Sequence, residues 1–264
     1  MVQFGFIGMG NMGKAIFTPV KEIFGADSII FHRNSMEEMK SFSEKKGVKY
    51  VNSNKDVAEQ AKYIILAVKP QMFKKIIDEI KENIKDDSVI ISLAPGITIE
   101  ELEKMTGRGR IVRAMPNTPA MVGQGMTGVC YDSAKFSDDE KEVLNKIFNG
   151  CGLMEKIDEK LMNAVVCASG SSPAYVFMFI EALADSVVEC GLPRDKAYKM
   201  VAQTVLGSAK LMLETGKHPG ELKDMVCSPG GTTIAAVSEL EKQGLRKSLF
   251  SATEACFEKC NRVK

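Results

Sequence analysis

The chain has almost no net charge and only two histidines, and both shortages exclude classes of function. Its 35 basic and 34 acidic residues leave a net charge of +1, which provides no electrostatic basis for binding a polyanion such as nucleic acid. His32 and His218 are each predicted to have structural roles, so histidine is not expected to act as the general acid or base of a reaction. A small-molecule ligand is therefore favoured.

Cysteines are present, but not in the spacing of a disulfide framework or a zinc site. None of the seven forms a CxxC pair, and an odd number argues against complete pairing. Cys256 and Cys260 lie four residues apart on a predicted helix and could share a metal ion, but no second pair or nearby histidine completes a site. The sequence therefore predicts no metal site. The cysteines are instead predicted to be buried thiols in a reducing cytoplasm.

No targeting or membrane segment is expected either. The N-terminus, MVQFGFIGMG, lacks the basic region and the small-residue cleavage site of a signal peptide. The longest uncharged run, residues 161–180, approaches the length of a membrane span, but Asn163 and the segment SGSSP interrupt it. We expect this run to form buried helices in a dimer.

Two halves of the chain follow different hydrophobic patterns, which predicts two domains, residues 1–156 and residues 157–264. In the first half, short β-branched runs alternate with amphipathic segments such as residues 70–84. Strands and helices in alternation imply parallel βαβ units and hence an α/β fold with a doubly wound, mostly parallel sheet. The predicted strands are residues 2–7, 28–32, 63–68, 88–93, 110–115 and 127–132.

After Ile157 the strand signals stop and helical periodicity takes over. Residues 174–184 are apolar on nearly every side of the predicted helix, which is typical of a helix buried between neighbours or subunits. The predicted helices of this half are residues 172–191, 195–216, 233–244 and 245–260.

The segment FGFIGMGNMGKA has the G-x-G-x-x-G spacing of a dinucleotide-binding turn, directly after a predicted strand and before a helix. Gly8 permits the tight turn, Gly10 lets a pyrophosphate approach the backbone, and Gly13 allows the helix to pack closely on the strand. The free N–H groups and dipole of the helix N-terminus then attract the phosphates. The alternative is a merely structural tight turn.

About twenty residues onward, an NAD-binding site usually offers a carboxylate to the ribose hydroxyls, but here the chain reads FHRNS. Arg33 can pair with a 2′-phosphate, Asn34 and Ser35 add neutral donors, and no carboxylate is expected beside Arg33 to repel the phosphate. This favours NADP(H). Alternatively, Arg33 only begins a solvated loop.

Three further segments indicate ligand contacts. The segments AVKPQ (67–71) and AMPNTPA (114–120) end predicted strands at the edge of the sheet where ligands bind, although proline-directed turns alone could explain them. The segment CSPGGTTIAAV (227–237) begins a helix with little side-chain cover, so its N–H groups are predicted to be exposed donors. The alternative is a purely structural role, in which the glycines make the turn flexible and Thr232 or Thr233 caps the helix.

In this order, the motifs GFIGMGNMG, AVKPQ, MPNTPA, SPAYVF, GLPR and SPGGTT resemble those of the pyrroline-5-carboxylate reductase family over nearly the whole chain. The resemblance implies a Rossmann-type NADP-binding domain followed by an all-helical domain for substrate binding and dimerisation. It also implies the last step of proline biosynthesis, in which NADPH, with NADH as the alternative, reduces the cyclic imine 1-pyrroline-5-carboxylate to L-proline.

The motifs and the resemblance together imply a set of site residues. The residues expected to contact NADPH are Ile7, Gly8, Met9, Gly10, Asn11, Met12, Gly13, Arg33, Asn34, Ser35, Asn54, Ala67, Val68, Lys69, Pro70, Leu93, Ala94, Pro95 and Asn117. Those expected to contact the substrate are Glu159, Met225, Ser228, Gly230, Gly231, Thr232 and Thr233. The chain departs from the family at Ser172, where glycine is common, and at Met225, where some members have a polar residue.

In the implied reaction, the N–H groups of PGGTT hold the substrate carboxylate. Thr233 is the catalytic candidate, because its hydroxyl could hydrogen-bond the ring nitrogen and orient the C=N bond. A hydroxyl is a poor acid, so the proton would come from a solution iminium or from water.

Two other functions are considered. A β-hydroxyacid dehydrogenase has a similar glycine-rich opening but uses a lysine on the first long helix of its second domain, and SPAYVFMFIEA contains none. A non-catalytic NADP(H)-sensing dimer would not need the substrate-carboxylate turn, so an intact SPGGTT argues against it.

Overall fold

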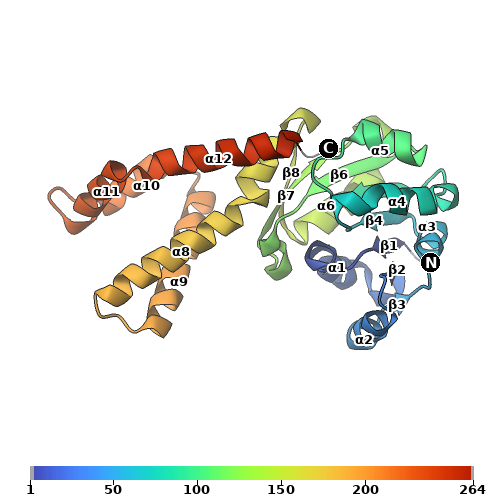
Figure 1. Cartoon of the computed structure of the whole chain (residues 1–264), viewed down its shortest axis with the longest axis horizontal. Helices are drawn as coiled ribbons and strands as arrows, with labels where there is room; N and C mark the ends of the chain where they lie inside the picture. The colour runs from blue at the N-terminus through green and yellow to red at the C-terminus, as the bar shows by residue number, and fades with distance from the viewer. Residues whose placement is uncertain (1–2, 263–264) are drawn as a thin grey trace. The chain divides into compact units, whose positions relative to one another are not determined.

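The structure, a computed structural model, describes residues 3–262 and divides into two compact units (Figure 1). The first comprises Met1–Ser171 together with Phe257–Lys264, and the second comprises Ser172–Cys256. The division expected between residues 156 and 157 stays a prediction. Val2, the first residue of the strand predicted at residues 2–7, lies outside the described residues.

The first unit is built on one eight-stranded sheet with the strand order β3-β2-β1-β4-β5-β6-β7-β8. All neighbouring strands are parallel except β6 and β7, which are antiparallel. The predicted mostly parallel, doubly wound α/β fold is therefore confirmed. The strands are β1 (Phe4–Ile7), β2 (Ile29–His32), β3 (Lys49–Tyr50), β4 (Tyr63–Leu66), β5 (Val89–Ser92), β6 (Ile111–Met115), β7 (Gly125–Cys130) and β8 (Gly152–Lys156).

Two strands, β3 and β8, were not predicted. β3 has two residues, which is too short for any alternation to be visible. β8 has the sequence GLMEK and lies at the sheet edge beside β7, where all five of its residues are exposed or half-buried. An edge strand that buries little surface has no long apolar run, so hydrophobic pattern alone does not detect it.

The two faces of the sheet have separate hydrophobic cores because side chains alternate along each strand. Phe4 and Phe6 of β1 lie in one core, with α1, α2 and α6, whereas Ile7 lies in the other, with α3, α4 and α5. Both layers of helices are visible around the sheet in Figure 1. The helices of this unit are α1 (Asn11–Phe24), α2 (Met36–Lys46), α3 (Asn54–Gln60), α4 (Pro70–Ile80), α5 (Ile99–Thr106), α6 (Asp138–Asn149) and α7 (Met162–Val165).

The second unit is entirely helical, as predicted. Helices α8 and α9 pack as a hairpin around Ala184, Ala197 and Val201, which are small side chains that bury little apolar surface. Two much larger side chains on α8, those of Phe177 and Met178, are more than 60% exposed in the single chain. The helices are α8 (Ser172–Glu189), α9 (Arg194–Thr215), α10 (Pro219–Val226), α11 (Thr232–Lys242) and α12 (Leu245–Arg262), of which α12 ends in the first unit.

The helical run Glu159–Glu189 is long enough and apolar enough to cross a membrane by length and composition alone. Only 6% of its most apolar window is buried inside the chain. A single run of this kind is weak evidence for a span, because length and composition do not show that it crosses a membrane.

The buried carboxylate of Glu140 makes part of the stability of the first unit depend on pH. Glu140, at the start of α6, forms ion pairs with Lys62 (3.0 Å) and Arg110. Burial opposes ionisation of Glu140, but the Ser137 N–H group and the two cations outweigh it and lower the pKa to about 2. An unfolded glutamate has its ordinary pKa near 4.5.

Because the pKa of Glu140 is lower in the folded state, the stabilisation is present above about pH 4.5 and is lost as the pH falls toward 2. We expect Glu140→Gln to lower the free energy of unfolding by roughly 2 kcal/mol at pH 7 and by progressively less below pH 4.5. Urea unfolding of both proteins across this range measures the difference. A constant difference at every pH would contradict the assignment.

Candidate active site

The turn between β1 and α1 contains three glycines, and the physical reason for glycine is not the same at all three positions. Gly8 has a φ of 88°, and a Cβ atom there would lie 2.7 Å from the Ala67 carbonyl oxygen. A Cβ at Gly13 would lie 2.6 Å from the Gly8 carbonyl oxygen, so strand and helix could not pack as closely. Packing within the fold therefore explains both of these glycines.

Gly10 is different, because a Cβ there would meet no described atom within 4 Å. It precedes α1 with an ordinary extended backbone, a φ of −72°, so neither strain nor packing requires a glycine. The open space lies at the N-terminus of a 14-residue helix whose first N–H groups have no intrahelical partner. A phosphate-bearing ligand that approaches the backbone here would account for Gly10, so the turn fits a dinucleotide.

A pocket of about 330 Å³ opens next to this turn. It lies where β1 and β4 are neighbours, which is the point where the strand order reverses and where ligands of such sheets bind. Ten of the residues predicted to bind the cofactor line it: Ile7, Gly8, Met9, Arg33, Asn34, Ser35, Asn54, Ala67, Val68 and Lys69. The pocket thus brings together residues from four separate segments of the chain.

The other predicted cofactor residues lie near this region but do not line the pocket. Asn11 and Met12 begin α1 beside Gly10, Pro70 begins α4, and Leu93, Ala94 and Pro95 directly follow β5. Asn117 is buried, and its Oδ1 accepts a hydrogen bond from the Met126 N–H group at 2.9 Å. That bond gives Asn117 a structural role between the ends of β6 and β7.

Four lining residues were not predicted: His32, Glu38, Met72 and Ile76. Glu38 is the important one, because it forms an ion pair with Arg33. The expectation that no carboxylate stands beside Arg33 is therefore wrong. Glu38 lies in the first turn of α2, where Ser35 caps the helix by accepting from the Glu38 N–H group at 3.3 Å. This helix start folds the carboxylate back onto the arginine.

The two histidines have structural contacts. The Nδ1 atom of His32 lies 3.0 Å from the Val51 carbonyl oxygen. His218 precedes α10, and its Nδ1 atom accepts a hydrogen bond from the Gly220 N–H group at 3.1 Å. Both observations agree with the structural roles predicted for these residues.

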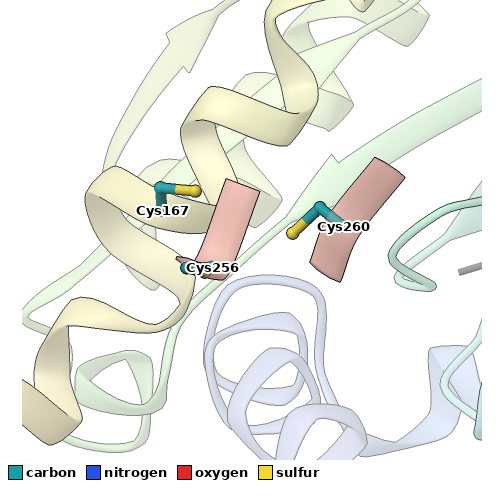
Figure 2. A group of neighbouring side chains, drawn as sticks. All are labelled: Cys167, Cys256 and Cys260. Atoms are coloured by element: carbon teal, nitrogen blue, oxygen red, sulfur yellow. The ribbon is translucent and has the colours of Figure 1, made fainter. Parts of the chain in front are cut away.

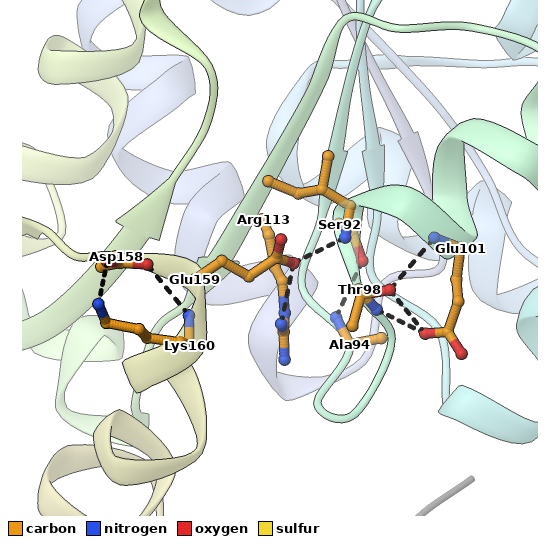
Figure 3. Close-up of polar contacts among 9 residues, drawn as sticks. Ser92, Ala94, Thr98, Glu101, Arg113, Asp158, Glu159 and Lys160 are labelled. Carbon is orange, nitrogen blue, oxygen red and sulfur yellow. Dashed lines mark hydrogen bonds and ion pairs between the residues drawn. The ribbon is translucent and has the colours of Figure 1, made fainter.

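Glu159, predicted to contact the substrate, is held by two neighbours in the first unit. Its Oε1 atom accepts a hydrogen bond from the Ile99 N–H group at 2.7 Å and lies 3.2 Å from Nη1 of Arg113. Figure 3 shows the Glu159 carboxylate pointing toward Arg113. Arg113 is only 3% exposed, so Glu159 compensates a buried charge.

The turn before α11 lies in the second unit and carries the remaining predicted substrate residues. Gly230 has a φ of 69°, and Gly231 is the residue before the helix, with no side-chain cap on α11 among the described residues. The proposed capping by Thr232 or Thr233 is therefore not seen. The Gly231 N–H group donates to the Ser228 carbonyl oxygen at 3.0 Å. The expectation that this N–H group is an exposed donor is therefore wrong. The available donors are the N–H groups of the first turn of α11.

The side chains around this turn differ in exposure. Thr232, Ser228 and Met225 are exposed, and Thr233 is half-buried. Met225, on α10, is 64% exposed and offers no hydrogen bond from its thioether comparable to that of a hydroxyl or amide. The arrangement suits an anion that binds main-chain N–H groups, with the Thr233 hydroxyl as the adjacent polar side chain.

Comparisons with known proteins cover nearly the whole chain. Residues 159–263 match the family model described as pyrroline-5-carboxylate reductase dimerisation, and residues 3–96 match the model described as NADP oxidoreductase coenzyme F420-dependent. The pyrroline-5-carboxylate reductase of Escherichia coli K12 is 45% identical, over 99% of this chain and 98% of its own. The enzyme of Pisum sativum is 39% identical, over 95% and 92%.

Solved structures give the same result. A pyrroline-5-carboxylate reductase from Coxiella burnetii superposes with a TM-score of 0.90 at 34% identity, over 98% of this chain and 97% of its own. The Plasmodium falciparum enzyme, solved with NADP bound, has a TM-score of 0.87 at 33% identity, over the same shares. An imine reductase from Streptomyces aurantiacus, at 15% identity and a TM-score of 0.56, shares the fold alone.

Proposed function

Because the chain belongs to the pyrroline-5-carboxylate reductase family, we propose which of its residues carry out the reaction of that family. The chain is an NAD(P)H-dependent oxidoreductase that reduces the C=N bond of 1-pyrroline-5-carboxylate and yields L-proline. The observation that best supports the assignment of residues is the pocket at the strand reversal beside Gly10, where the space that a side chain would fill is open.

Residues of the pocket would hold the cofactor. The first turn of α1 would bind the pyrophosphate, and Arg33 with Asn34 and Ser35 would bind the 2′-phosphate end. The nicotinamide end would be shaped by the remaining predicted cofactor residues, which are Ala67–Pro70, Leu93–Pro95 and Asn117. When bound, the cofactor supplies a hydride from C4 of its nicotinamide ring.

The ion pair between Arg33 and Glu38 should make the choice between NADPH and NADH adjustable. A 2′-phosphate must compete with the Glu38 carboxylate for the guanidinium and is repelled by it. We expect Glu38→Gln to tighten NADPH binding about threefold and Arg33→Gln to weaken it about tenfold, with NADH affinity changed less than twofold in both. Fluorescence titration with each cofactor measures the effects.

Two results would contradict this role. Equal changes for NADPH and NADH would show that the pair acts on the shape of the pocket and not on the 2′-phosphate. Unchanged NADPH binding by both variants would remove Arg33 from the cofactor site and favour the solvated-loop alternative. Glu37→Gln is a matched control, because Glu37 is an exposed neighbour of Glu38 in the first turn of α2 and does not line the pocket.

The first turn of α11 would bind the substrate carboxylate. Its N–H groups have no side-chain cap among the described residues and no acidic side chain beside them, so a bound anion would be stabilised by donors and dipole alike. Thr233 would hydrogen-bond the ring nitrogen and orient the C=N bond, while the proton would come from water or a solution iminium. Glu159, Met225 and Ser228 are proposed as further substrate contacts.

The working enzyme is proposed to be a dimer or a higher homo-oligomer in the cytoplasm. The support is the dimerisation model matched by residues 159–263 and the large apolar side chains of α8 that the single chain leaves exposed. A second copy would cover Phe177, Met178 and their neighbours, which also explains the membrane-like hydropathy of Glu159–Glu189 without a membrane. Light scattering of the purified protein tests the assembly.

A direct assay tests the whole assignment. Loss of NADPH absorbance on adding 1-pyrroline-5-carboxylate, with proline as the product, is expected. An NADP(H)-sensing dimer would bind the cofactor without this loss, and a β-hydroxyacid dehydrogenase would instead show turnover with a hydroxyacid. Either outcome would overturn the proposed roles of α11 and Thr233.

A further inference from the structure

A buried arginine of the first unit lies beside the strand end that leads into the nicotinamide segment, Leu93–Pro95. Arg113 of β6 is the register partner of Ser92, the last residue of β5, and is only 3% exposed. The chain leaves β5 directly through the nicotinamide segment, which is proposed to shape the nicotinamide end of the cofactor site. Figure 3 shows Arg113 next to this strand end. Any group that fixes the segment would affect where the nicotinamide ring lies.

The far end of the same loop is fixed by Glu159, which lies sixty residues away from its partner Ile99 in the sequence. The Ile99 N–H group is the first of α5, and the N–H groups of a first helical turn have no acceptor within the helix. It donates to Glu159 Oε1 at 2.7 Å, while Thr98 caps the helix by accepting from the Glu101 N–H group at 3.2 Å. Glu159 therefore helps to set where α5 begins, and with it the end of the loop that starts at Leu93.

The segment that carries Glu159 is itself fixed within the first unit. Met162, three residues later, is fully buried in a hydrophobic cluster of this unit. Further along, the sulfur atom of Cys167 lies within 4.8 Å of that of Cys260, which belongs to the same unit, and Figure 2 shows these two side chains. Glu159 is therefore presented to the loop from a packed support.

Stability alone does not account for Arg113. Its guanidinium forms one hydrogen bond with Glu159, from Nη1 to Oε1 at 3.2 Å, and not the stronger bidentate pair. Its Nε atom is buried and has no hydrogen-bond partner among residues 3–262. Burying a cation in this way costs free energy, and an apolar side chain of similar volume is often as good for stability. Because Nε is buried, no ligand reaches it without rearrangement, so a role in the reaction must pass through Glu159.

We propose that Arg113 is a positioning residue for hydride transfer, which orients Glu159 and thereby fixes the nicotinamide segment against the cofactor. The inference rests on the proposed function, because that function assigns the segment to the nicotinamide end. Placement of the reacting groups affects the rate steeply, since an error of about 1 Å can cost roughly a hundredfold. The phosphates would be held elsewhere, by the turn at Gly10 and by Arg33, so cofactor affinity should not depend on Arg113.

Single-turnover kinetics of Arg113→Gln tests this role. The rate constant for loss of NADPH absorbance is expected to fall about tenfold, while NADPH affinity stays within about twofold of wild type. Partial unfolding would lower the amplitude of the single turnover and not its rate constant, so a merely structural role is recognised. The fluorescence emission of bound NADPH reports the surroundings of the nicotinamide without substrate, and it should also change in Arg113→Gln.

Three further variants locate the effect. Arg113→Lys keeps the charge and a donor for Glu159, so it should retain roughly a third or more of the wild-type rate constant. Asp158→Asn is the matched control, because Asp158 is an exposed carboxylate next to Glu159 that pairs with Lys160 at 3.0 Å, and it should behave as wild type does. In a Glu159→Gln background, Arg113→Gln should cost less than about threefold, since residues that act through one contact are not additive.

The outcomes separate the inference from the function on which it rests. A wild type that does not reduce 1-pyrroline-5-carboxylate would overturn the proposed function itself. With an active wild type, the inference alone fails if Arg113→Gln keeps the wild-type rate constant, loses NADPH affinity as much as rate, or leaves the emission of bound NADPH unchanged. It also fails if Arg113→Gln costs as much in the Glu159→Gln background as in wild type, because Arg113 would then not act through Glu159.

Discussion

Replacing Gly10 with leucine is expected to weaken NADPH binding at least a hundredfold while the thermal unfolding midpoint stays within about 2 °C of wild type. A side chain at this position meets no described atom of the protein, so the fold has no reason to reject it. It would, however, occupy the space at the N-terminus of α1 through which a pyrophosphate approaches the backbone. Fluorescence titration with NADPH and thermal unfolding of the same samples measure both quantities.

The neighbouring Gly13 provides the contrasting control. A Cβ there would lie 2.6 Å from the Gly8 carbonyl oxygen, so Gly13→Ala should lower the unfolding midpoint as well as NADPH affinity. Loss of binding without loss of stability should therefore be specific to Gly10. If Gly10→Leu bound NADPH as well as wild type does, the cofactor could not lie over this turn, and the assignment of the pocket would be wrong.

Substituting Thr233 with alanine is expected to lower turnover about a hundredfold and to leave NADPH affinity within twofold of wild type. The hydroxyl is proposed to orient the C=N bond of the substrate, and misplacing a reacting group by about 1 Å can cost roughly this factor in rate. The N–H groups of α11 remain in the variant, so carboxylate binding should be weakened less than turnover. Steady-state kinetics in both substrates separates kcat from KM.

Two control variants test whether the hydroxyl itself is responsible. Thr233→Ser keeps the hydroxyl and should retain at least a third of wild-type turnover. Thr232→Ala removes the exposed hydroxyl of the preceding residue in the same turn and should have a smaller effect than Thr233→Ala. Equal losses of turnover and NADPH affinity in Thr233→Ala would indicate damage to the protein as a whole and would contradict the orienting role.

The sheet was predictable because its central strands are buried on both faces. Such strands form continuous apolar runs, as in Tyr63–Leu66 and Val89–Ser92, and each is followed by a helix with its own period. β3 and β8 lack these runs because they lie at the two edges of the sheet and bury less surface. β7 was predicted as a strand, but the local hydrophobic pattern does not indicate whether a strand runs parallel or antiparallel to its neighbour.

The cofactor pocket was largely predictable because one motif combines glycine spacing with a strand and a helix. Glu38 was missed because the helix dipole already explains a carboxylate in the first turn of a helix. Nothing in the sequence therefore predicts a second contact for it. Its contact with Arg33 depends on how tightly the loop from β2 to α2 turns.

The small interior of the helical unit has a consequence for how the protein is made. Ala184, Ala197 and Val201 contribute little free energy against the entropy of ordering some eighty residues. If a second copy supplies the missing apolar cover, this unit becomes fully ordered only as chains associate. Its maturation would then follow second-order kinetics, and newly synthesised chains at low abundance would be the form most open to proteases.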